Sequence, residues 1–326
     1  MSALHIPMQE KFPRWNDFSQ GPVQSLSGWH SRPQLSILRL DLLQSWATGN
    51  KYYKLKYAIE FALRNGISTI VSKGGMFSNH LAALAEACKV FDFHLIAVIR
   101  SYVPDENNPS IRKLKENGSD IMYVNPQAYD SFDETEAQRL FPGAMFIPEG
   151  GLSETGIRGT SEIMNDLDAG KSTHVIVSGG SMGTACGIIS AAPADVKVII
   201  IPAWKGCTEL YIHEILHSYH ITNACSWEIW PDYHFGGFGR FNPQLIDFMI
   251  SFSEETSIPI DPVYTGKMMY AIDDQWKSGY FKETDSVLAI HTGGLQGLEG
   301  YRYRFPEAWG KYLSVDRMIR LRSPQG

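Results

Sequence analysis

The sequence has 326 residues, of which 44% are hydrophobic and 12% aromatic, and its formal net charge is −6 at pH 7. A chain of this length can bury a sizeable core in one large or two interleaved domains, and its acidic balance argues against nucleic acid as the main partner. No apolar run reaches the length of a membrane span, and the first residues lack the basic and apolar regions of a signal peptide. The cysteines (Cys88, Cys186, Cys207 and Cys225) show no C-x-x-C spacing. We therefore expect a cytoplasmic protein with reduced thiols that does not bind membranes.

The first part of the chain changes character near residue 50. Residues 1–45 are irregular apart from one predicted strand at 35–40, and helices and strands then alternate. Asn50 is a good candidate for a helix N-cap, and Asn65-Gly66 supplies the stop for the helix that contains Lys51. The elements expected after it are a strand at 68–72, a helix at 81–88, a strand at 95–99, a helix at 110–116 and a strand at 120–124.

The second half repeats this pattern after Gly150 and Gly151, which mark a crossing between domains. We expect helices at 156–168, 184–192, 208–219, 243–255 and 266–278, and strands at 173–177, 196–201 and 286–290. Alternating strands and helices predict an α/β fold with two mostly parallel sheets flanked by helices. Residues 46–151 are predicted to form a small domain, and residues 1–45 plus 152–326 a large one.

Lys51 lies in the first turn of its predicted helix, where the helix dipole disfavours a positive charge. The pKa of its amine should therefore be lowered, which is what an amine needs to form a Schiff base near neutral pH. For a single lysine, the ordinary interpretation is a solvated side chain on a polar helix face. The motifs further along the chain favour the reactive interpretation.

Three glycine-containing loops follow predicted strands, and ligands of parallel sheets bind where strands end. The first loop, 74–80, reads G-G-M-F-S-N-H, and Ser78 and Asn79 would either cap a helix or contact a ligand. The second, 178–185, reads S-G-G-S-M-G-T-A and offers backbone N–H groups and hydroxyls to a phosphate. It lacks the lysine of a Walker loop and narrowly misses the dinucleotide pattern. The third, 291–295, reads H-T-G-G-L and is preceded by Y-T-G-K at 264–267.

A competing signal is H-E-x-x-H at His213, Glu214 and His217, the pattern of a zinc hydrolase. Leu210, Ile215, Leu216 and Tyr219 are expected to form the apolar stripe of this helix, which leaves both histidines beside a packing face. No third ligand stands in a recognisable context, so the zinc interpretation is the weaker one. We expect no metal site.

Taken together and in this order, G-N-K-x-x-K-L, G-G-x-x-S-N-H, the loop at 180–184, Y-T-G-K and H-T-G-G make the chain similar to one family. From about residue 35 onwards it resembles the 1-aminocyclopropane-1-carboxylate deaminase and D-cysteine desulfhydrase group of pyridoxal 5'-phosphate enzymes. That resemblance implies the tryptophan-synthase β-type fold (fold type II), with the cofactor in the large domain, and a homodimer.

The resemblance also implies roles for particular residues. Lys51 would carry the cofactor and move the substrate α-proton, although Lys54, Lys73 and Lys267 are alternative carriers on residue type alone. Ser78 would contact the substrate carboxylate or act as a nucleophile, and Tyr264 would line the pocket. The cofactor-binding set would comprise Asn79 at the ring hydroxyl, Gly180, Ser181, Met182, Gly183 and Thr184 at the phosphate, and Thr292 at the pyridine nitrogen.

Two departures decide between the activities of this group. Deaminases proper place an acidic residue, preceded by tyrosine, where this chain has His291 and Thr292, and a glutamine where it has Phe77. Without a carboxylate at the pyridine nitrogen the ring is a weaker electron sink, which favours β-elimination. We therefore predict a D-cysteine desulfhydrase-like enzyme that acts on a small amino acid, with 1-aminocyclopropane-1-carboxylate deamination as the alternative. A zinc hydrolase and a non-catalytic amino-acid or cofactor sensor are the alternatives from other classes.

Overall fold

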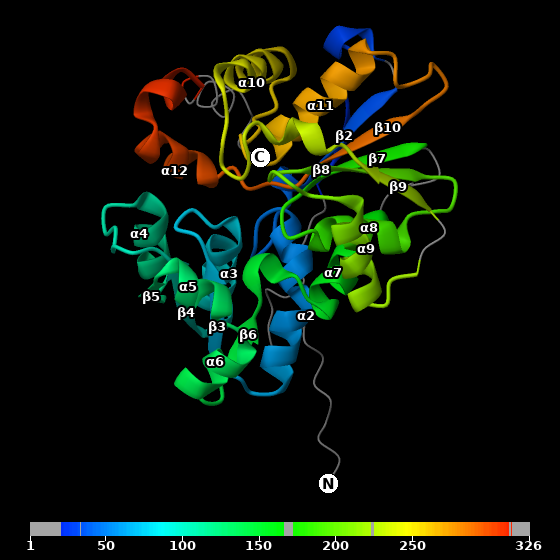
Figure 1. Ribbon diagram of the computed structural model, residues 1–326. Helices are drawn as coiled ribbons and strands as arrows, with labels where there is room; N and C mark the ends of the chain where they lie inside the picture. The colour runs from blue at the N-terminus through cyan, green and yellow to red at the C-terminus, as the bar shows by residue number, and fades with distance from the viewer. Residues whose placement is uncertain (1–20, 33, 166–171, 223–224, 313, 315–326) are drawn as a thin grey trace.

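The strands of the protein form two separate sheets (Figure 1). The computed structural model describes residues 21–32, 34–165, 172–222, 225–312 and 314. The six-stranded sheet has the order β1-β2-β10-β7-β8-β9, and all its neighbours are parallel except β1 and β2. Its strands are β1 (Val23–Ser25), β2 (Leu35–Arg39), β7 (His174–Gly179), β8 (Lys197–Pro202), β9 (Ser226–Ile229) and β10 (Val287–His291).

The four-stranded sheet is parallel throughout and has the order β5-β4-β3-β6. Its strands are β3 (Thr69–Gly74), β4 (His94–Arg100), β5 (Asp120–Val124) and β6 (Met145–Ile147). The helices are α2 (Asn50–Arg64), α3 (Asn79–Phe91), α4 (Pro109–Glu116), α5 (Pro126–Ser131), α6 (Glu134–Leu140), α7 (Glu154–Asn165), α8 (Gly183–Ala191), α9 (Glu209–Ser218), α10 (Pro243–Thr256), α11 (Thr265–Lys277) and α12 (Gly297–Arg304). Short 3-10 turns occupy η2 (Trp29–Ser31), η3 (Leu40–Leu42), η4 (Glu149–Gly151) and η6 (Pro231–His234).

The large sheet is covered on both faces, which explains why its inner strands are almost continuously apolar. Side chains alternate along a strand, so Val175 and Val177 of β7 belong to the core beside α7 and α8. Ile176, between them, belongs to the core beside α10 and α11. Figure 1 shows these two helix layers on opposite sides of the sheet.

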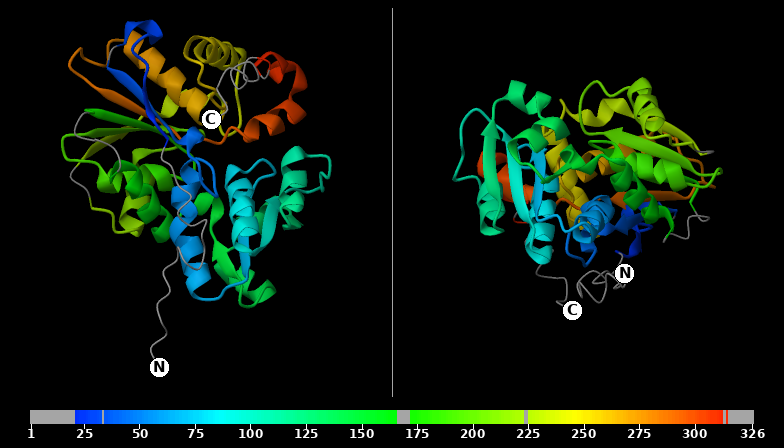
Figure 2. Two further views of the ribbon diagram at one scale, coloured as in Figure 1. Left: turned by 180° about the vertical axis from the view of Figure 1, so that it is seen from behind. Right: turned by 90° about the horizontal axis from the view of Figure 1, so that it is seen from below.

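Helix α2 lies between the two sheets and packs mainly against α7 (Figure 2). One apolar cluster runs from Ile70 and Leu95 of the small sheet, through Leu55 and Ile59 of α2, to Val177 of the large sheet. The two sheets are therefore joined by a shared core on one side. The carboxyl ends of β3, β7 and β10 meet on the other side, where the three glycine-containing loops lie.

The fold class predicted from the sequence is confirmed, and most predicted elements lie within a few residues of those observed. The strand at 120–124 has the predicted bounds, whereas the end of the helix predicted at 156–168 lies outside the described residues. Strands β1, β6 and β9 and helices α5, α6 and α12 were not expected. These elements are short, and α12 carries two glycines, so their patterns are weak.

Two local expectations from the sequence were wrong. Asn50 is not the N-cap of its helix, because Gly49 holds that position and makes no side-chain capping bond. Leu210 does not belong to the packing stripe of α9, since its side chain is 66% exposed. Ile212 supplies the buried position instead, together with Ile215 and Leu216.

The strands of the small sheet all fall within residues 46–151, and those of the large sheet fall outside that range. The domain boundaries themselves stay a prediction. Each of the four cysteines has a free thiol. In the described ranges, no helix combines the length and the apolar character that crossing a membrane requires.

Candidate active site

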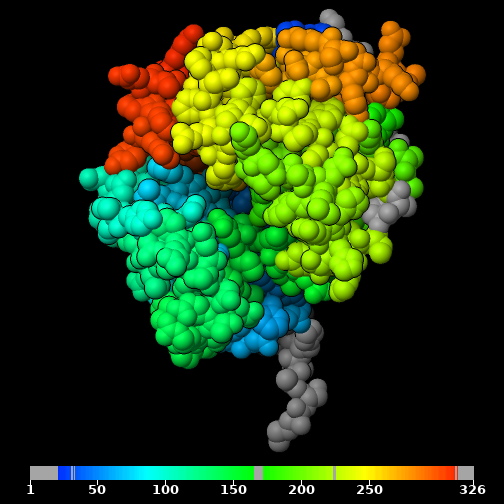
Figure 3. Space-filling view, viewed as in Figure 1, coloured from blue at the N-terminus to red at the C-terminus, as the bar shows by residue number. Residues whose placement is uncertain are grey.

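The three glycine-containing loops converge on one cavity of about 930 Å³ between the two sheets. The space-filling view shows the surface hollowed between the cyan and teal segments and the yellow and light-green ones (Figure 3). The structure brings nearly all predicted site residues together here. The lining includes Lys51, Ser78, Asn79, Gly180, Ser181, Met182, Thr184, Tyr264 and Thr292, and Gly183 follows Met182 in the chain.

The amine of Lys51 lies in this cavity and donates a hydrogen bond to Oδ1 of Asn50, at 2.8 Å. Burial lowers the pKa of Lys51 to about 8, and the carboxylate of Asp261 partly opposes this shift. The direction agrees with the prediction, but the main cause is removal from water rather than the helix dipole. A substantial fraction of the amine is therefore neutral near pH 8 and able to attack a carbonyl.

Asn50 connects Lys51 to the other parts of the site. Its side-chain amide donates to Oγ1 of Thr184 at 2.8 Å, and its backbone N–H donates to the carbonyl of Thr292 at 3.1 Å. Gly49 allows this approach, because a Cβ there would lie 2.3 Å from the Thr292 carbonyl oxygen. The start of α2 is thus tied to both the second and the third glycine-containing loop.

The second loop leads into α8 and forms an anion site. Met182 adopts a left-handed conformation (φ 63°) before the helix starts at Gly183, and the first-turn N–H groups of an α-helix have no partners within it. Lys54 lies beside this loop, with its Nζ 3.0 Å from Oγ of Ser181 and 2.9 Å from the carbonyl of Gly150. Burial and the charge of Lys51 hold the pKa of Lys54 well below its usual range. A bound dianion would reverse this effect.

Lys54 was considered only as an alternative cofactor carrier in the sequence. It lies three residues after Lys51, and helical spacing places residues i and i+3 on one face. That spacing was the available signal for a second amine in the site. Of the other candidate carriers, Lys73 binds the carbonyls of Tyr129 and Phe132, and Lys267 does not line the cavity.

The first loop leads into α3, whose N-cap is Ser78. Its Oγ accepts the N–H of Leu81 at 3.2 Å, so its hydroxyl proton is directed elsewhere. The next two residues, Asn79 and His80, also line the cavity. Oδ1 of Asn79 and Nδ1 of His80 are buried and have no hydrogen-bond partner among the described residues. A ligand that enters this end of the cavity therefore meets unpartnered acceptors as well as the N-terminus of a helix.

His80 was named in the motif without a role, and its contacts assign it one. Its Nε2 lies 2.9 Å from Oγ of Ser72, whose hydroxyl donates to the carbonyl of Ile147. Nε2 must therefore carry the hydrogen and Nδ1 the lone pair. Burial, with the charges of Lys51 and Lys54, lowers the pKa of His80 to about 3, so the ring stays neutral.

Tyr264 is positioned by a residue that the sequence interpretation missed. The carboxylate of Asp261 accepts the N–H groups of Val263, Tyr264 and Thr265, each at 2.8 to 3.0 Å, and so caps the start of α11. Burial is the main cause that raises the pKa of Tyr264, which keeps the phenol protonated. A Cβ at Gly180 would lie 2.9 Å from this ring, so the second loop needs a glycine to pass it.

At the third loop, Thr292 lines the cavity, whereas His291 is fully buried behind it. Nε2 of His291 bonds the carbonyl of Pro259 at 2.8 Å, and Nδ1 accepts the N–H of Gly293 at 3.2 Å. Among the residues that the structure describes, Glu149 and Asp261 alone bring carboxylates to the cavity lining, and both oxygens of Asp261 accept hydrogen bonds from N–H groups or a hydroxyl. The residue available at the predicted pyridine position is therefore Thr292.

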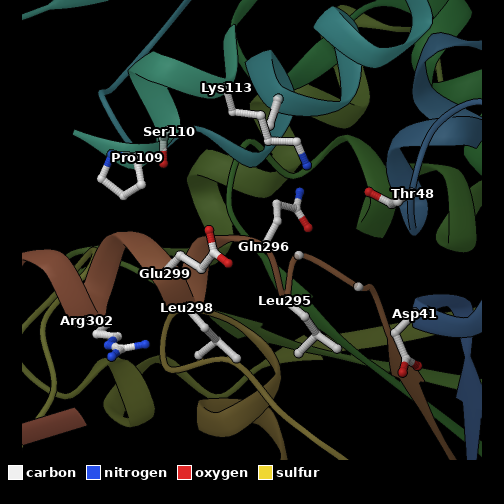
Figure 4. A pocket seen from close by; sticks show the side chains of 13 residues that line it. Asp41, Thr48, Pro109, Ser110, Lys113, Leu295, Gln296, Leu298, Glu299 and Arg302 are labelled. Carbon is white, nitrogen blue, oxygen red and sulfur yellow. The ribbon is translucent and has the colours of Figure 1, made fainter. Parts of the chain in front are cut away.

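A second cavity of about 460 Å³ lies behind Gly293 and Gly294, between α4 and α12 (Figure 4). Lys113 and Ser110 line one side of it, and Glu299 and Arg302 the other. Its lining shares Gly294 with that of the candidate active site but does not include Lys51.

The zinc pattern lies elsewhere. His213, Glu214 and His217 are exposed on α9 and do not line the main cavity, and the ring of His213 packs on that of Trp227 at 4.8 Å. Within the part of the chain that the structure describes, no group of three or more His, Cys, Asp or Glu residues is placed to hold a metal ion.

Comparison with known proteins identifies the class of protein that this site defines. A family model described as pyridoxal-phosphate dependent enzyme matches residues 22–293, so the chain belongs to that family. It is 27% identical, over 81% of its length and 86% of the relative's, to a Pyrococcus horikoshii protein with the provisional name 1-aminocyclopropane-1-carboxylate deaminase. It is 24% identical to D-cysteine desulfhydrase of Salmonella newport, over 82% and 89% of the two chains.

A solved structure described as an ACC deaminase homologue superposes with a TM-score of 0.75 at 25% identity, and covers 92% of this chain and 97% of that one. The expected fold type II arrangement is therefore confirmed. The described residues also fit the cofactor of the family. The amine of Lys51 has a lowered pKa and can be neutral, and the start of α8 with Lys54 forms an anion site. The side-chain oxygens of Asn79 and Ser178 are buried acceptors without a partner among the described residues. Phosphate, aldehyde and ring hydroxyl each find a suitable partner in this set.

Proposed function

We propose that the protein is a pyridoxal-phosphate lyase that deaminates a small amino acid by β-elimination, with D-cysteine as the favoured substrate. The observation that carries the proposal is the convergence of Lys51, the α3 N-terminus and the α8 anion loop on one cavity, with Thr292 and no free carboxylate at the third loop. The products from D-cysteine and water would be pyruvate, hydrogen sulfide and ammonia.

The chemistry that pyridoxal phosphate would supply when bound is an aldehyde for the substrate amine and a ring that withdraws electrons from the bond between Cα and its hydrogen. The protein residues divide the remaining work. The amine of Lys51, with its pKa near 8, can accept the α-proton at neutral pH. Ser78 and the first N–H groups of α3 can bind the substrate carboxylate, and Asn79 the ring hydroxyl. Gly180 to Thr184 with Lys54 can hold the phosphate.

The leaving group is the point at which elimination and ring opening differ. Tyr264 keeps its proton and lines the cavity, so its phenol can donate a hydrogen bond to a departing sulfur atom. A threonine beside the pyridine nitrogen cannot hold a proton there as a carboxylate would. The weaker electron sink supports elimination of a good leaving group over opening of a cyclopropane ring. Ring opening of 1-aminocyclopropane-1-carboxylate to 2-oxobutanoate and ammonia stays the alternative.

We further propose a cytoplasmic homodimer, as the resemblance implies. The acidic net charge and the free thiols support the compartment. Sedimentation of the purified protein would test the oligomeric state. The domain assignment, with 46–151 as the small domain, is supported by the separation of the two sheets along the chain.

Replacing Lys51 tests the proposal most directly. Lys51→Ala should lose turnover by several orders of magnitude, because the α-proton then has no base. Borohydride reduction of the wild-type protein should bleach its violet absorption and leave the label on Lys51 in peptide maps. Lys56→Ala is the matched control, since Lys56 lies on the same helix but pairs with Glu162 at 2.6 Å.

The outcomes separate the functional alternatives. Turnover near wild type in Lys51→Ala would refute the assignment. Pyruvate with sulfide from D-cysteine supports elimination, whereas 2-oxobutanoate from the cyclopropane substrate supports the deaminase. Bound cofactor without ammonia from any amino acid would indicate a sensor. Stoichiometric zinc and loss of activity with a chelator would indicate the hydrolase.

A further inference from the structure

Lys267 is fully buried and does not line the cavity, yet its ammonium group makes three hydrogen bonds. It donates to the backbone carbonyls of Ala203 at 3.0 Å, His234 at 2.8 Å and Gly237 at 2.9 Å. A lysine ammonium has three donors, so all are used on backbone oxygens. A buried charge of this kind is costly unless it is fully hydrogen-bonded, which indicates a specific role.

Two of the three carbonyls, those of His234 and Gly237, attach a glycine-rich loop, residues 235–240, to Lys267. Gly236, Gly237 and Gly239 have φ values of 92°, 116° and 67°, a backbone region that other residues rarely adopt. Glycine loses more conformational freedom on ordering than any other residue. Beyond the Lys267 bonds, the N–H of Gly237 donates to the carbonyl of His234 and the N–H of Arg240 to that of Gly237. The N–H of Gly236 also donates to Nδ1 of His234 at 2.9 Å.

This 235–240 loop forms part of the cavity wall. Phe238, Gly239 and Arg240 line the cavity, and the ring of Phe238 meets that of Tyr264 edge-on at 6.0 Å. A Cβ at Gly239 would lie 3.1 Å from the hydroxyl oxygen of Tyr301, so the loop passes close to α12.

The third carbonyl ties this wall to the anion loop. Ala203 is followed by Trp204, whose indole N–H donates to the carbonyl of Gly180 at 3.2 Å. Lys267 also lies one helical turn after Tyr264 on α11. One ammonium therefore connects three segments that surround the cavity without touching its contents.

We propose that Lys267 is a positioning residue, which holds the 235–240 loop in place as the wall that the substrate side chain meets. Burial lowers the pKa of Lys267 to about 8, and the negative charge of Asp261 partly offsets this shift. The role of this wall in substrate binding rests on the proposed function. The inference that Lys267 holds the 235–240 loop in place does not.

The test replaces Lys267 by Met, which keeps the length of the side chain and removes its donors. In the cofactor-loaded enzyme, Lys267→Met should retain the violet absorption and raise KM about tenfold with a smaller change in kcat, because charged hydrogen bonds of this strength are lost from the loop. Trypsin should also cut after the exposed Arg240 faster than in wild type. Lys277→Met is the control, since Lys277 ends the same helix, its side chain is 62% exposed, and it pairs with Asp273 at 2.7 Å.

A double-mutant cycle with Phe238→Ala distinguishes a loop effect from general damage. If Lys267 acts through the loop, its replacement should change KM much less when Phe238 is already truncated. Unchanged KM and unchanged cleavage after Arg240 in Lys267→Met would overturn the proposal, as would fully additive effects in the cycle.

A second variant covers the case in which Lys267→Met does not fold. Gly237→Ala disturbs the residue whose carbonyl Lys267 binds and leaves Lys267 intact. The φ of 116° strains the new residue, while its methyl group makes ordinary van der Waals contact with Lys205 at 3.8 Å. It should raise KM and speed cleavage after Arg240 with the cofactor retained, and no change in either would overturn the proposal. If no variant or wild type turned over any amino acid, the proposed function would fail, while the cleavage measurement would still decide the loop-holding step.

Discussion

Lys51 combines a reactive amine with an environment that controls its charge. Burial in the cavity shields the amine from water and lowers its pKa to about 8. The hydrogen bond to Asn50 fixes the position of the amine within the cavity. Only the neutral amine attacks an aldehyde. Below its pKa the amine is mostly protonated, so the capture of cofactor must slow as the pH falls.

We expect the rate at which the apoprotein captures pyridoxal phosphate to rise about tenfold between pH 7 and pH 9, with a midpoint near 8. The appearance of violet absorption after mixing measures this rate. Nα-acetyl-lysine under the same conditions, whose side-chain amine has the ordinary pKa of 10.5, corrects for the titration of the cofactor itself. A midpoint above 10 in the protein would show that burial does not lower the pKa of Lys51.

Replacing Asn50 by Asp should move this midpoint upwards. A carboxylate at hydrogen-bond distance from Nζ of Lys51 stabilises the ammonium form, so the neutral amine appears only at higher pH. Cofactor capture at pH 7.5 should then slow by about tenfold or more. Asn50→Ala, which removes the same bonds without adding charge, should leave the midpoint close to that of wild type. Equal midpoints in the Asp and Ala variants would contradict this account.

At the scale of elements, the site depends on where α2 begins. Its start packs on the third loop through Gly49, whose φ is 61° and whose added Cβ would lie 2.3 Å from the Thr292 carbonyl oxygen. Gly66, just beyond the other end of α2, has a similar φ of 65° but no atom within 4 Å of an added Cβ. Gly49 therefore combines a backbone conformation almost confined to glycine with close packing, whereas Gly66 has a positive φ without the packing.

Gly49→Ala should weaken the site far more than Gly66→Ala. Both variants place a side chain on backbone with positive φ, which costs about 1 kcal/mol or more. Only Gly49→Ala also meets a ψ of −149°, a conformation almost confined to glycine, and must separate α2 from the third loop. The thermal midpoint for loss of violet absorption should fall by several degrees more in Gly49→Ala. Equal shifts in the two variants would mean that this contact does not hold the site together.

Elements with a strong hydrophobic periodicity could be predicted from the sequence, whereas the side-chain contacts between elements could not. The apolar strand at 196–201 and the small-residue helix at 184–192 were found because burial on both faces leaves a clear pattern. Asn50 was misassigned because an asparagine before a helix is usually its cap, whereas here the side chain reaches Thr184, 134 residues away. The bond of Trp204 was missed for the same reason, since its partner Gly180 is 24 residues away. Asp261 and His80 have nearer partners, at Val263 to Thr265 and at Ser72, but those contacts form only once the loop before α11 and strand β3 are folded.

The glycine motifs predicted the site better than any single residue did. The three loops lie at strand ends, and parallel sheets bring such ends to one edge, so their convergence followed from the pattern. Only its spacing to Lys51 indicated that Lys54 lies at the anion loop. Nothing in the sequence indicated that Lys267 binds three backbone carbonyls. A buried lysine with backbone partners resembles an ordinary polar residue until the fold is known.

For the whole molecule, the site joins the two sheets. Its amine lies on α2, its α3 N-terminus follows the small sheet, and its anion loop follows β7 of the large sheet. A cofactor that contacts all three should bind only when both sheets are folded and correctly placed. Its binding energy then stabilises both, by about 2.7 kcal/mol at a concentration one hundred times Kd.

Cofactor loading should therefore slow hydrogen exchange at both helix starts together. We expect increased protection near Ser78–Leu81 of the small-sheet side and near Gly183–Cys186 of the large-sheet side, measured by mass spectrometry on loaded and apo protein. Strand β9 at the edge of the large sheet serves as the reference, because none of its residues line the cavity. Protection confined to the α8 side would mean that the cofactor is held by the large sheet alone. In that case Asn79 would not contact it, and the small sheet would serve the substrate only.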